Sequence, residues 1–252
     1  MSIKGGALVT GAGKRIGRAI ALDLATNGWT IAAHYHRSPV EAETLVDEIV
    51  AAGGTAVALA ADLADPAETV ELVDRAVAVL GPVTVLVNNA SAFERDSIGD
   101  LSVDLWDTHL DINLRAPALL TRAFADALPP ETEGNVVNLI DQRVWNLTGE
   151  FLSYSVSKVG LWGLTQMTAL ALAPRIRVNG IGPGPVLPSS RQSAADFARQ
   201  CAATPLGRGS SPEEICDAVR YILSARGMTG QMIALDGGAH LTWRTASGAP
   251  LE

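Results

Sequence analysis

Near the N-terminus the chain reads Ala7-Leu8-Val9-Thr10-Gly11-Ala12-Gly13-Lys14-Arg15-Ile16-Gly17, and this segment indicates the fold. A short apolar run enters a turn that contains three glycines, and a helical pattern then continues to residue 28. Glycines at such a turn let backbone N–H groups approach a pyrophosphate at the start of a helix. The segment is therefore either a nucleotide site or a tight connection between a strand and a helix.

The same alternation of strand and helix continues along the chain. Apolar runs predict strands at 7–9, 30–35, 55–60, 83–87, 135–140, 176–181 and 231–235. Helical patterns lie between them, and the helix predicted at 103–128 should bend at Pro117. This order is typical of an α/β protein. We expect a single doubly wound Rossmann domain over residues 1–252, with a seven-stranded, mostly parallel sheet and helices on both faces.

The composition narrows the possible functions. Hydrophobic residues make up 48% of the 252 residues and aromatic residues only 5%, which suits a parallel sheet rich in small aliphatic side chains. The net charge of −8 argues against a nucleic acid or an anionic membrane as partner. Cys201 and Cys216 are too few for a disulfide framework or a metal site, and no apolar run reaches membrane-spanning length. We therefore expect a cytoplasmic protein without a metal.

Basic and polar side chains follow the second strand. His36, Arg37 and Ser38 stand where proteins of this architecture that bind NAD carry an acidic residue for the ribose hydroxyls. A guanidinium matches a phosphate in fork geometry, and Arg15 in the glycine-rich turn can add another. These residues favour the 2′-phosphate of NADP over NAD. The alternative is that they only solvate a loop.

Two further strand ends carry groups suited to a ligand. Asp62 follows the third strand, where it could cap a turn or meet an adenine amino group. The fourth strand is followed by Asn88-Asn89-Ala90-Ser91-Ala92-Phe93, whose small residues permit the close approach of a ligand. The alternative for that turn is a purely structural one, stabilised by its two asparagine side chains. Open α/β sheets bind ligands at the carboxyl ends of their strands.

An aspartate, a tyrosine and a lysine stand close together around the fifth strand. Asp141 ends the apolar run at 135–140, and Tyr154 and Lys158 follow at a spacing of four residues. On a helix this spacing places the phenol and the ammonium on one face, where the ammonium should lower the pKa of the phenol. The hydroxyl then becomes a usable proton donor. A tyrosine and a lysine also occur at this spacing by chance, so the context has to decide.

Three other segments suggest roles at the site or in assembly. Asn113, in the middle of a predicted helix, is expected to be either a packing polar group or the holder of a water molecule. The long connection at 186–205 follows the sixth strand and is predicted to be a substrate lid. The helix that continues to Ala173 is apolar on more than one face, which predicts a subunit interface. We expect a homotetramer.

These motifs together resemble the short-chain dehydrogenase/reductase family. The resemblance rests on the glycine-rich turn, Asn88-Asn89-Ala90, Tyr154 through Lys158, and Asp236-Gly237-Gly238, in that order over nearly the whole chain. It implies that Tyr154 donates a proton, that Lys158 lowers its pKa and holds the nicotinamide ribose, and that Asn113 positions a water. The NADPH/NADP contacts that it implies are Gly11, Arg15, Ile16, Gly17, His36, Arg37, Ser38, Asp62, Leu63, Asn89, Ala90, Ser91, Tyr154, Lys158, Pro183 and Gly184.

Asp141 departs from the family pattern, which usually has a serine at this position. A serine donates a hydrogen bond to a substrate carbonyl, which an ionised carboxylate cannot do. The set of Asp141, Tyr154 and Lys158 is instead similar to that of the pteridine reductase branch, as is the stretch His34-Tyr35-His36-Arg37-Ser38. By this resemblance the substrate is a pterin or folate-like molecule. The residues implied to bind it are Arg15, Ser91, Phe93, Asp141 and Tyr154, with Phe93 stacked on the ring.

Three functions remain open from the sequence. The first is NADPH-dependent reduction of a dihydropteridine, dihydromonapterin or folate-like ring. The second keeps the fold and cofactor but reduces a ketone or a 3-oxoacyl group, as most of the larger family does. The third is a non-catalytic sensor or scaffold that binds NADP, which the presence of both Tyr154 and Lys158 disfavours. The segments at 141–146 and 186–205, which would select the substrate, do not decide between the first two.

Overall fold

The computed structural model describes residues 4–189 and 191–242. The strands are β1 Gly6–Val9, β2 Thr30–Tyr35, β3 Ala56–Ala60, β4 Val83–Asn88, β5 Gly134–Leu139, β6 Ile176–Pro183 and β7 Met232–Leu235. The α-helices are α1 Arg15–Thr26, α2 Pro39–Ala51, α3 Pro66–Leu80, α4 Val103–Leu110, α5 Ala116–Ala127, α6 Leu152–Leu172, α7 Ala194–Ala202 and α8 Pro212–Ser224. Short helical turns lie at Asp111–Arg115, Gln142–Val144 and Ala239–Leu241.

The seven strands form one sheet in the order β3-β2-β1-β4-β5-β6-β7. Every neighbouring pair is parallel, so the predicted doubly wound sheet is confirmed, and within the described residues it is parallel throughout. The order of the strands reverses between β1 and β4. Because all carboxyl ends lie at one edge, this reversal leaves a crevice above β1 and β4 where ligands bind in such sheets.

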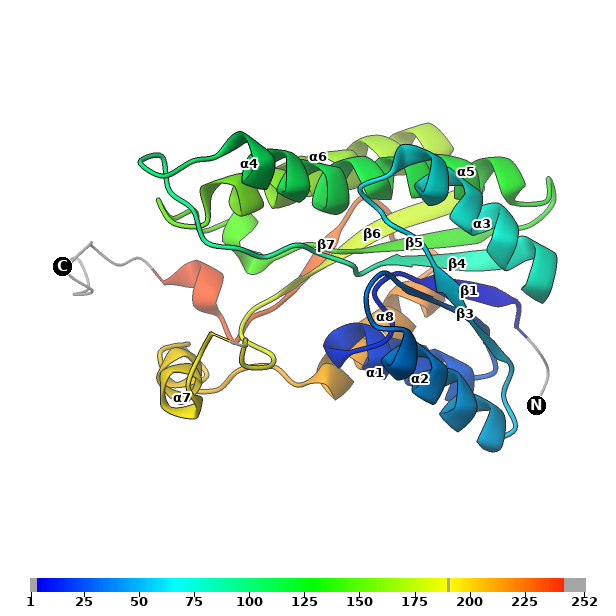
Figure 1. Cartoon of the computed structure of the whole chain (residues 1–252), viewed down its shortest axis with the longest axis horizontal. Helices are drawn as coiled ribbons and strands as arrows, with labels where there is room; N and C mark the ends of the chain where they lie inside the picture. The colour runs from blue at the N-terminus through cyan, green and yellow to red at the C-terminus, as the bar shows by residue number, and fades with distance from the viewer. Residues whose placement is uncertain (1–3, 190, 243–252) are drawn as a thin grey trace.

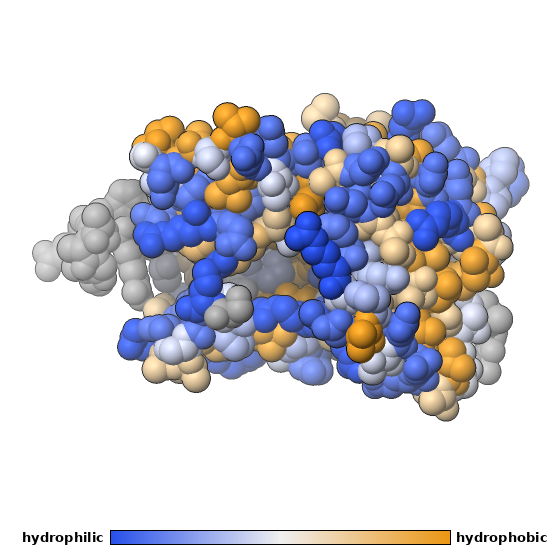
Figure 2. All heavy atoms as spheres, in the orientation of Figure 1, coloured by the Kyte–Doolittle hydropathy of each residue, from blue (hydrophilic) through white to orange (hydrophobic). Residues whose placement is uncertain are grey.

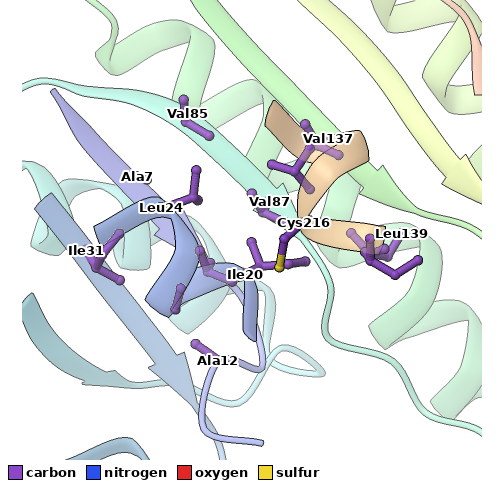
Figure 3. Packing of buried hydrophobic residues seen from close by; sticks show 14 of the residues in the cluster. Ala7, Ala12, Ile20, Leu24, Ile31, Val85, Val87, Val137, Leu139 and Cys216 are labelled. Atoms are coloured by element: carbon purple, nitrogen blue, oxygen red, sulfur yellow. The ribbon is translucent and has the colours of Figure 1, made fainter. Parts of the chain in front are cut away.

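Helices cover both faces of the sheet, with α1, α2 and α8 on one side and α3, α5 and α6 on the other (Figure 1). Figure 3 shows one of the hydrophobic core clusters, where Ile20 and Leu24 of α1 lie near Val85 and Val87 of β4. Small aliphatic side chains on the strands let the helices pack closely. Within the described residues, no helix is both long enough and apolar enough to cross a membrane.

The segment predicted as one helix bent at Pro117 is divided at a different place. Helix α4 ends at Leu110, a π-helical turn covers Asp111–Arg115, and Pro117 lies in the first turn of α5. A proline is well tolerated there because its missing N–H has no helical partner to lose. The break therefore lies in the π turn, which contains the fully buried Asn113.

Strand β6 is longer than predicted and runs to Pro183. Its last residues, Gly182 and Pro183, pair with Ala234 and Leu235 of β7. This extension carries the chain directly to Gly184 at the carboxyl edge of the sheet. In the space-filling view this side of the molecule is hollowed between the two helix layers, and mostly hydrophilic residues surround the hollow (Figure 2).

Candidate active site

Asp141, Tyr154 and Lys158 lie together at the carboxyl end of β5. Tyr154 and Lys158 belong to the first turns of α6 and are both buried. The Tyr154 hydroxyl donates a hydrogen bond of 2.7 Å to Asp141 Oδ2. The Arg143 backbone N–H donates to the other carboxylate oxygen at 2.8 Å. Asp141 therefore points toward the phenol and not into the apolar interior.

The pKa of Tyr154 differs from the sequence prediction. Burial raises this pKa well above its ordinary value, and the charge of Asp141 and the hydrogen bond to it add to the effect. Lys158 does not reverse the shift, because its Nζ donates to the Leu139 carbonyl at 2.8 Å and lies 5.7 Å from the centre of the tyrosine ring. The net shift of this pKa is therefore upward, opposite to the predicted direction, and the effect of Lys158 on it stays a prediction. Burial also lowers the pKa of Lys158 to about 8.

Asn113 joins the turn after β4 to helix α6. Its Oδ1 accepts hydrogen bonds from the Ser91 hydroxyl at 3.1 Å and the Ala92 N–H at 2.8 Å. Its Nδ2 donates to the Ala92 carbonyl and to Ser157 Oγ, both at 3.0 Å. The structure therefore confirms the packing role of Asn113. Its role in holding a water stays a prediction.

Two aromatic rings border the Tyr154 hydroxyl. Phe93 and Phe151 stack with a centroid distance of 4.7 Å and an interplanar angle of 3°. Phe93 also meets Tyr154 edge-on at 4.7 Å and is only partly buried, so it is not a core residue under the loop. Phe151 adopts the left-handed conformation, with φ of 57°, just before α6. Nothing in the sequence marks a phenylalanine for this strained conformation.

A cavity of about 410 Å³ lies over the glycine-rich turn, and we call it the glycine-turn cavity. Ten predicted cofactor residues line it: Gly11, Arg15, Ile16, Gly17, His36, Asp62, Leu63, Asn89, Ala90 and Ser91. The turn is tightly packed, because a Cβ at Gly17 would lie 2.3 Å from the Gly11 carbonyl oxygen. Such a glycine cradle beside a helix start fits the pyrophosphate of a dinucleotide.

The residues predicted to take a 2′-phosphate lie together next to the glycine-turn cavity. His36, Arg37 and Ser38 line a neighbouring hollow with Lys14. Two of these groups have acidic partners, since Lys14 Nζ is 2.6 Å from Glu41 and His36 Nε2 is 3.6 Å from Asp62. Arg37 has no hydrogen-bond or ion-pair partner among the residues that the structure describes. Its charge is therefore free for an anion.

His34 was not predicted as part of the site, yet it fixes the glycine-rich turn. Its Nδ1 accepts from the Gly11 N–H at 3.0 Å, and its Nε2 lies 3.1 Å from the Ala61 carbonyl. The ring is thus neutral with its proton on Nε2, and burial lowers its pKa to about 4. Its position within a buried apolar strand gave no sequence signal of this role.

A second cavity, of about 500 Å³, opens beside Tyr154, and we call it the Tyr154 cavity. Arg15 and Ile16 line both cavities, so the two meet at the start of α1. Predicted site residues in its wall are Phe93, Asp141, Tyr154, Pro183 and Gly184. The predicted lid contributes Val186, Leu187, Ser189, Arg191, Gln192, Phe197 and Gln200, while residue 190 lies outside the described residues. Whether this segment closes on a substrate stays a prediction.

Comparison with known proteins places the chain in a family. The family model for enoyl-(acyl carrier protein) reductase matches residues 11–240. The crystal structure of FolM alternative dihydrofolate reductase 1 from Brucella canis, complexed with NADP, is 47% identical, with a TM-score of 0.95 and 99% of each chain covered. A blue fluorescent protein from a metagenomic library, in complex with NADPH, is 32% identical, with a TM-score of 0.87 over 94% of this chain and 98% of that chain.

A relative by sequence is the 3-oxoacyl-(acyl-carrier-protein) reductase FabG of Staphylococcus aureus. It is 32% identical over 248 residues, which cover 96% of this chain and 100% of the relative. The matches therefore extend over both cavities and the sheet that supports them. The fully parallel sheet, the glycine-rich turn and the Tyr154–Lys158 pair agree with them. The chain belongs to the short-chain dehydrogenase/reductase family and is an oxidoreductase.

Proposed function

We propose that this protein is an NADPH-dependent reductase that transfers hydride to a pteridine-type ring, in a dihydropteridine, dihydromonapterin or folate-like substrate. The observation that supports this most directly is the Asp141 carboxylate, 2.7 Å from the Tyr154 hydroxyl in the wall of the Tyr154 cavity. The Brucella canis structure, which is similar over the full chain, is described as an alternative dihydrofolate reductase complexed with NADP.

A carboxylate at this place favours a nitrogen ring over a ketone. Reduction of a ketone develops negative charge on oxygen, which the nearby Asp141 carboxylate would repel. Reduction of a ring C=N bond instead needs a proton on nitrogen, and a neighbouring carboxylate favours that protonated form. The stacked rings of Phe93 and Phe151 line the same cavity and form an aromatic wall beside which a heterocycle can lie.

The residues of the site supply the proton and the orientation. Bound NADPH supplies the hydride. Tyr154 keeps its own proton because its pKa is raised, and it can donate this proton to the ring nitrogen next to the carbon that is reduced. Asp141 holds the hydroxyl in place. The phenolate that remains after the proton transfer is favoured by the positive charge of the Lys158 ammonium when that ammonium lies close to it.

The cofactor would lie along the glycine-turn cavity and reach Tyr154 past Arg15 and Ile16. The backbone of the glycine-rich turn would hold its pyrophosphate, and Asp62 and Leu63 would border the adenine. Arg37, with His36 and Ser38, would hold the 2′-phosphate. Asn89, Ala90 and Ser91 line the same cavity and would border the nicotinamide half.

A carbonyl reductase is the second candidate, because the similar FabG of Staphylococcus aureus is a 3-oxoacyl-(acyl-carrier-protein) reductase. The two candidates differ in what Asp141 does. A serine at position 141 would restore a donor for a carbonyl oxygen and remove the repulsive charge. Asp141→Ser should therefore raise ketone reduction and lower pterin reduction.

The test is NADPH oxidation by the pure protein with dihydrobiopterin, dihydromonapterin, dihydrofolate, a simple ketone and a 3-oxoacyl thioester. We expect turnover of at least one pterin, a large loss of that turnover in Asp141→Ser, and a loss of about 100-fold or more in Tyr154→Phe. Turnover of the thioester or ketone without turnover of any pterin would instead support the second candidate. Tyr154→Phe serves as the control that the measured oxidation depends on the proposed proton donor.

A further inference from the structure

The Tyr154 cavity is rich in arginine although the protein as a whole is acidic. Arg15, Arg95, Arg143 and Arg191 all line this cavity, while the whole chain carries a net charge of −8. Arginine is suited to carboxylate and phosphate because its planar group offers two parallel N–H donors. Arg15 faces both cavities and is accounted for by the cofactor, which leaves three arginines without a role in the proposed reaction.

Arg143 differs from the other arginines because its guanidinium is unpaired. Arg95 binds Glu150 at 2.7 Å, Arg191 pairs with Glu94, and Arg15 donates to the carbonyls of Leu187 and Pro188. Within residues 4–189 and 191–242, the Arg143 side chain makes no hydrogen bond or ion pair. Three carboxylates, those of Asp141, Glu94 and Glu150, thus face four arginines, which leaves one positive charge in excess.

Arg143 is nevertheless held in a defined place. Its guanidinium carbon lies 4.8 Å from the centre of the Phe151 ring, and Phe151 stacks on Phe93. Phe151 is anchored in its left-handed conformation, because its N–H donates to the Asp96 carbonyl at 2.7 Å. A flat arginine placed on an aromatic ring is pre-oriented, so it loses little freedom when it binds an anion.

The other two arginines lie at the more exposed side of the same cavity. Their ion pairs with Glu94 and Glu150 are solvent-exposed, with 43% to 68% of each side chain accessible. Exposed ion pairs contribute little to stability, so a ligand carboxylate can replace either glutamate at small cost. Arg191 also donates to the Phe93 carbonyl at 2.7 Å, which ties this rim to the aromatic wall.

We propose that Arg143, with Arg95 and Arg191 at the rim, binds a carboxylate on the tail of the substrate and so selects a folate-type molecule over pterins with neutral side chains. This inference rests on the proposed pterin reduction and names the substrate class within it. The ring would lie by Phe93 and Tyr154, where the chemistry occurs. The tail would leave the ring toward the arginines, past Phe151.

The test compares kcat/KM for dihydrofolate, whose tail carries carboxylates, with kcat/KM for dihydrobiopterin, which has none. We expect Arg143→Gln to lower the ratio of the two values about tenfold, the usual cost of one charge-assisted hydrogen-bond pair. Arg143 uses only its backbone N–H to hold Asp141, so the substitution leaves that contact in place. The matched control is Arg122→Gln, an exposed arginine of α5 outside both cavities, which should leave the ratio unchanged.

A second measurement uses the unmodified enzyme. Added salt should raise KM for dihydrofolate and leave KM for dihydrobiopterin nearly unchanged, because only the former depends on an ionic contact. A ratio unaffected by both Arg143→Gln and salt, with turnover of both substrates, overturns this inference and leaves the proposed function standing. The absence of turnover with every pterin overturns both.

Discussion

The charge of Asp141 raises the pKa of both of its buried neighbours, Tyr154 and Lys158. Its negative charge and its hydrogen bond disfavour the phenolate of Tyr154, which adds to the effect of burial and raises the pKa of the tyrosine. The same charge favours the ammonium of Lys158, whose pKa burial lowers to about 8. A single carboxylate thus keeps the proton on both groups that proton transfer needs.

This arrangement predicts the basic side of the pH profile. Lys158 carries its charge below its pKa of about 8, so kcat/KM for the preferred pterin should fall as the pH rises through that value. Asp141→Asn removes a charge that raises the pKa values of both Lys158 and Tyr154. The decrease of kcat/KM should therefore occur at lower pH in this variant. The measurement is kcat/KM from pH 5 to 10, with saturating NADPH. A profile whose basic side is the same in both proteins would contradict this account.

Some of these residues could be predicted from the sequence and others could not. The spacing of Asp141, Tyr154 and Lys158 around a strand end was sufficient to bring them together. The direction of the tyrosine pKa shift was not predictable, since it depends on the burial of Tyr154 and on its hydrogen bond to Asp141. Arg143 gave no signal either, because its role depends on the position of Phe151, eight residues later.

Arg37 should determine the choice between NADPH and NADH. It is exposed and has no hydrogen-bond or ion-pair partner among the described residues, and the residues that follow β2, His36 to Ser38, include no aspartate or glutamate. We expect KM for NADPH to be at least about tenfold lower than KM for NADH, and Arg37→Ala to raise the value for NADPH by about tenfold. NADH is the internal control, since it lacks the phosphate and its KM should change little. Similar KM values for the two cofactors in the natural protein would refute this prediction.

The loop after β4 and the start of α6 are joined by a buried chain of polar side chains. His109 Nε2 accepts from the Glu94 N–H at 3.1 Å, so the ring proton lies on Nδ1, 2.6 Å from Ser153 Oγ. The Ser153 hydroxyl in turn donates to Asp96. Asp96, His109 and Ser153 are all at most 1% exposed. This chain fixes Phe93 on one element relative to Tyr154 on another.

Removal of the Ser153 hydroxyl, which lies between His109 and Asp96, should therefore affect both stability and activity. Ser153→Ala leaves His109 and Asp96 buried with one hydrogen-bond partner fewer each, which should cost about 1–3 kcal/mol in the free energy of unfolding. Urea unfolding measures this cost, and kcat should fall in the same protein as Phe93 loses its fixed position. Ser224→Ala, at an exposed helix end, is the control and should change stability by less than about 0.5 kcal/mol. Equal stability of the two variants would mean that the chain of hydrogen bonds does not hold the loop.

The regular elements followed from local sequence more closely than the irregular ones. Pro39, Pro66 and Pro212 each begin a helix, because the proline ring fixes φ at a helical value and needs no N–H partner there. The π turn around Asn113 was not predictable, since it is stabilised by hydrogen bonds to Ala92 and Ser157, which are distant in sequence. Strand β6 was predicted too short because Gly182 and Pro183 are poor strand formers.

The topology of the molecule brings the two cavities to one edge of the sheet. The glycine-turn cavity lies over β1, and the Tyr154 cavity lies toward β5 and β6, with Arg15 and Ile16 between them. A dinucleotide that spans the reversal in strand order thus ends beside Tyr154. The positive arginines at this edge also contrast with the net negative charge of the chain, which should favour approach of an anionic substrate on this side.

Helix α6 should join copies of this chain into a homotetramer, because it presents large apolar side chains on the side away from the sheet. Met167 and Leu170 are 70% and 84% exposed in the single chain, and water contact of that extent disfavours an isolated protomer. Sedimentation should give four times the 26.3 kDa of one chain, and Met167→Glu with Leu170→Glu should give smaller species by burying charge in the interface. Val40→Glu, at an equally exposed position on α2, is the matched control and should leave the mass unchanged. A natural protein that sediments as a monomer, or a double variant with unchanged mass, would show that α6 does not form the interface.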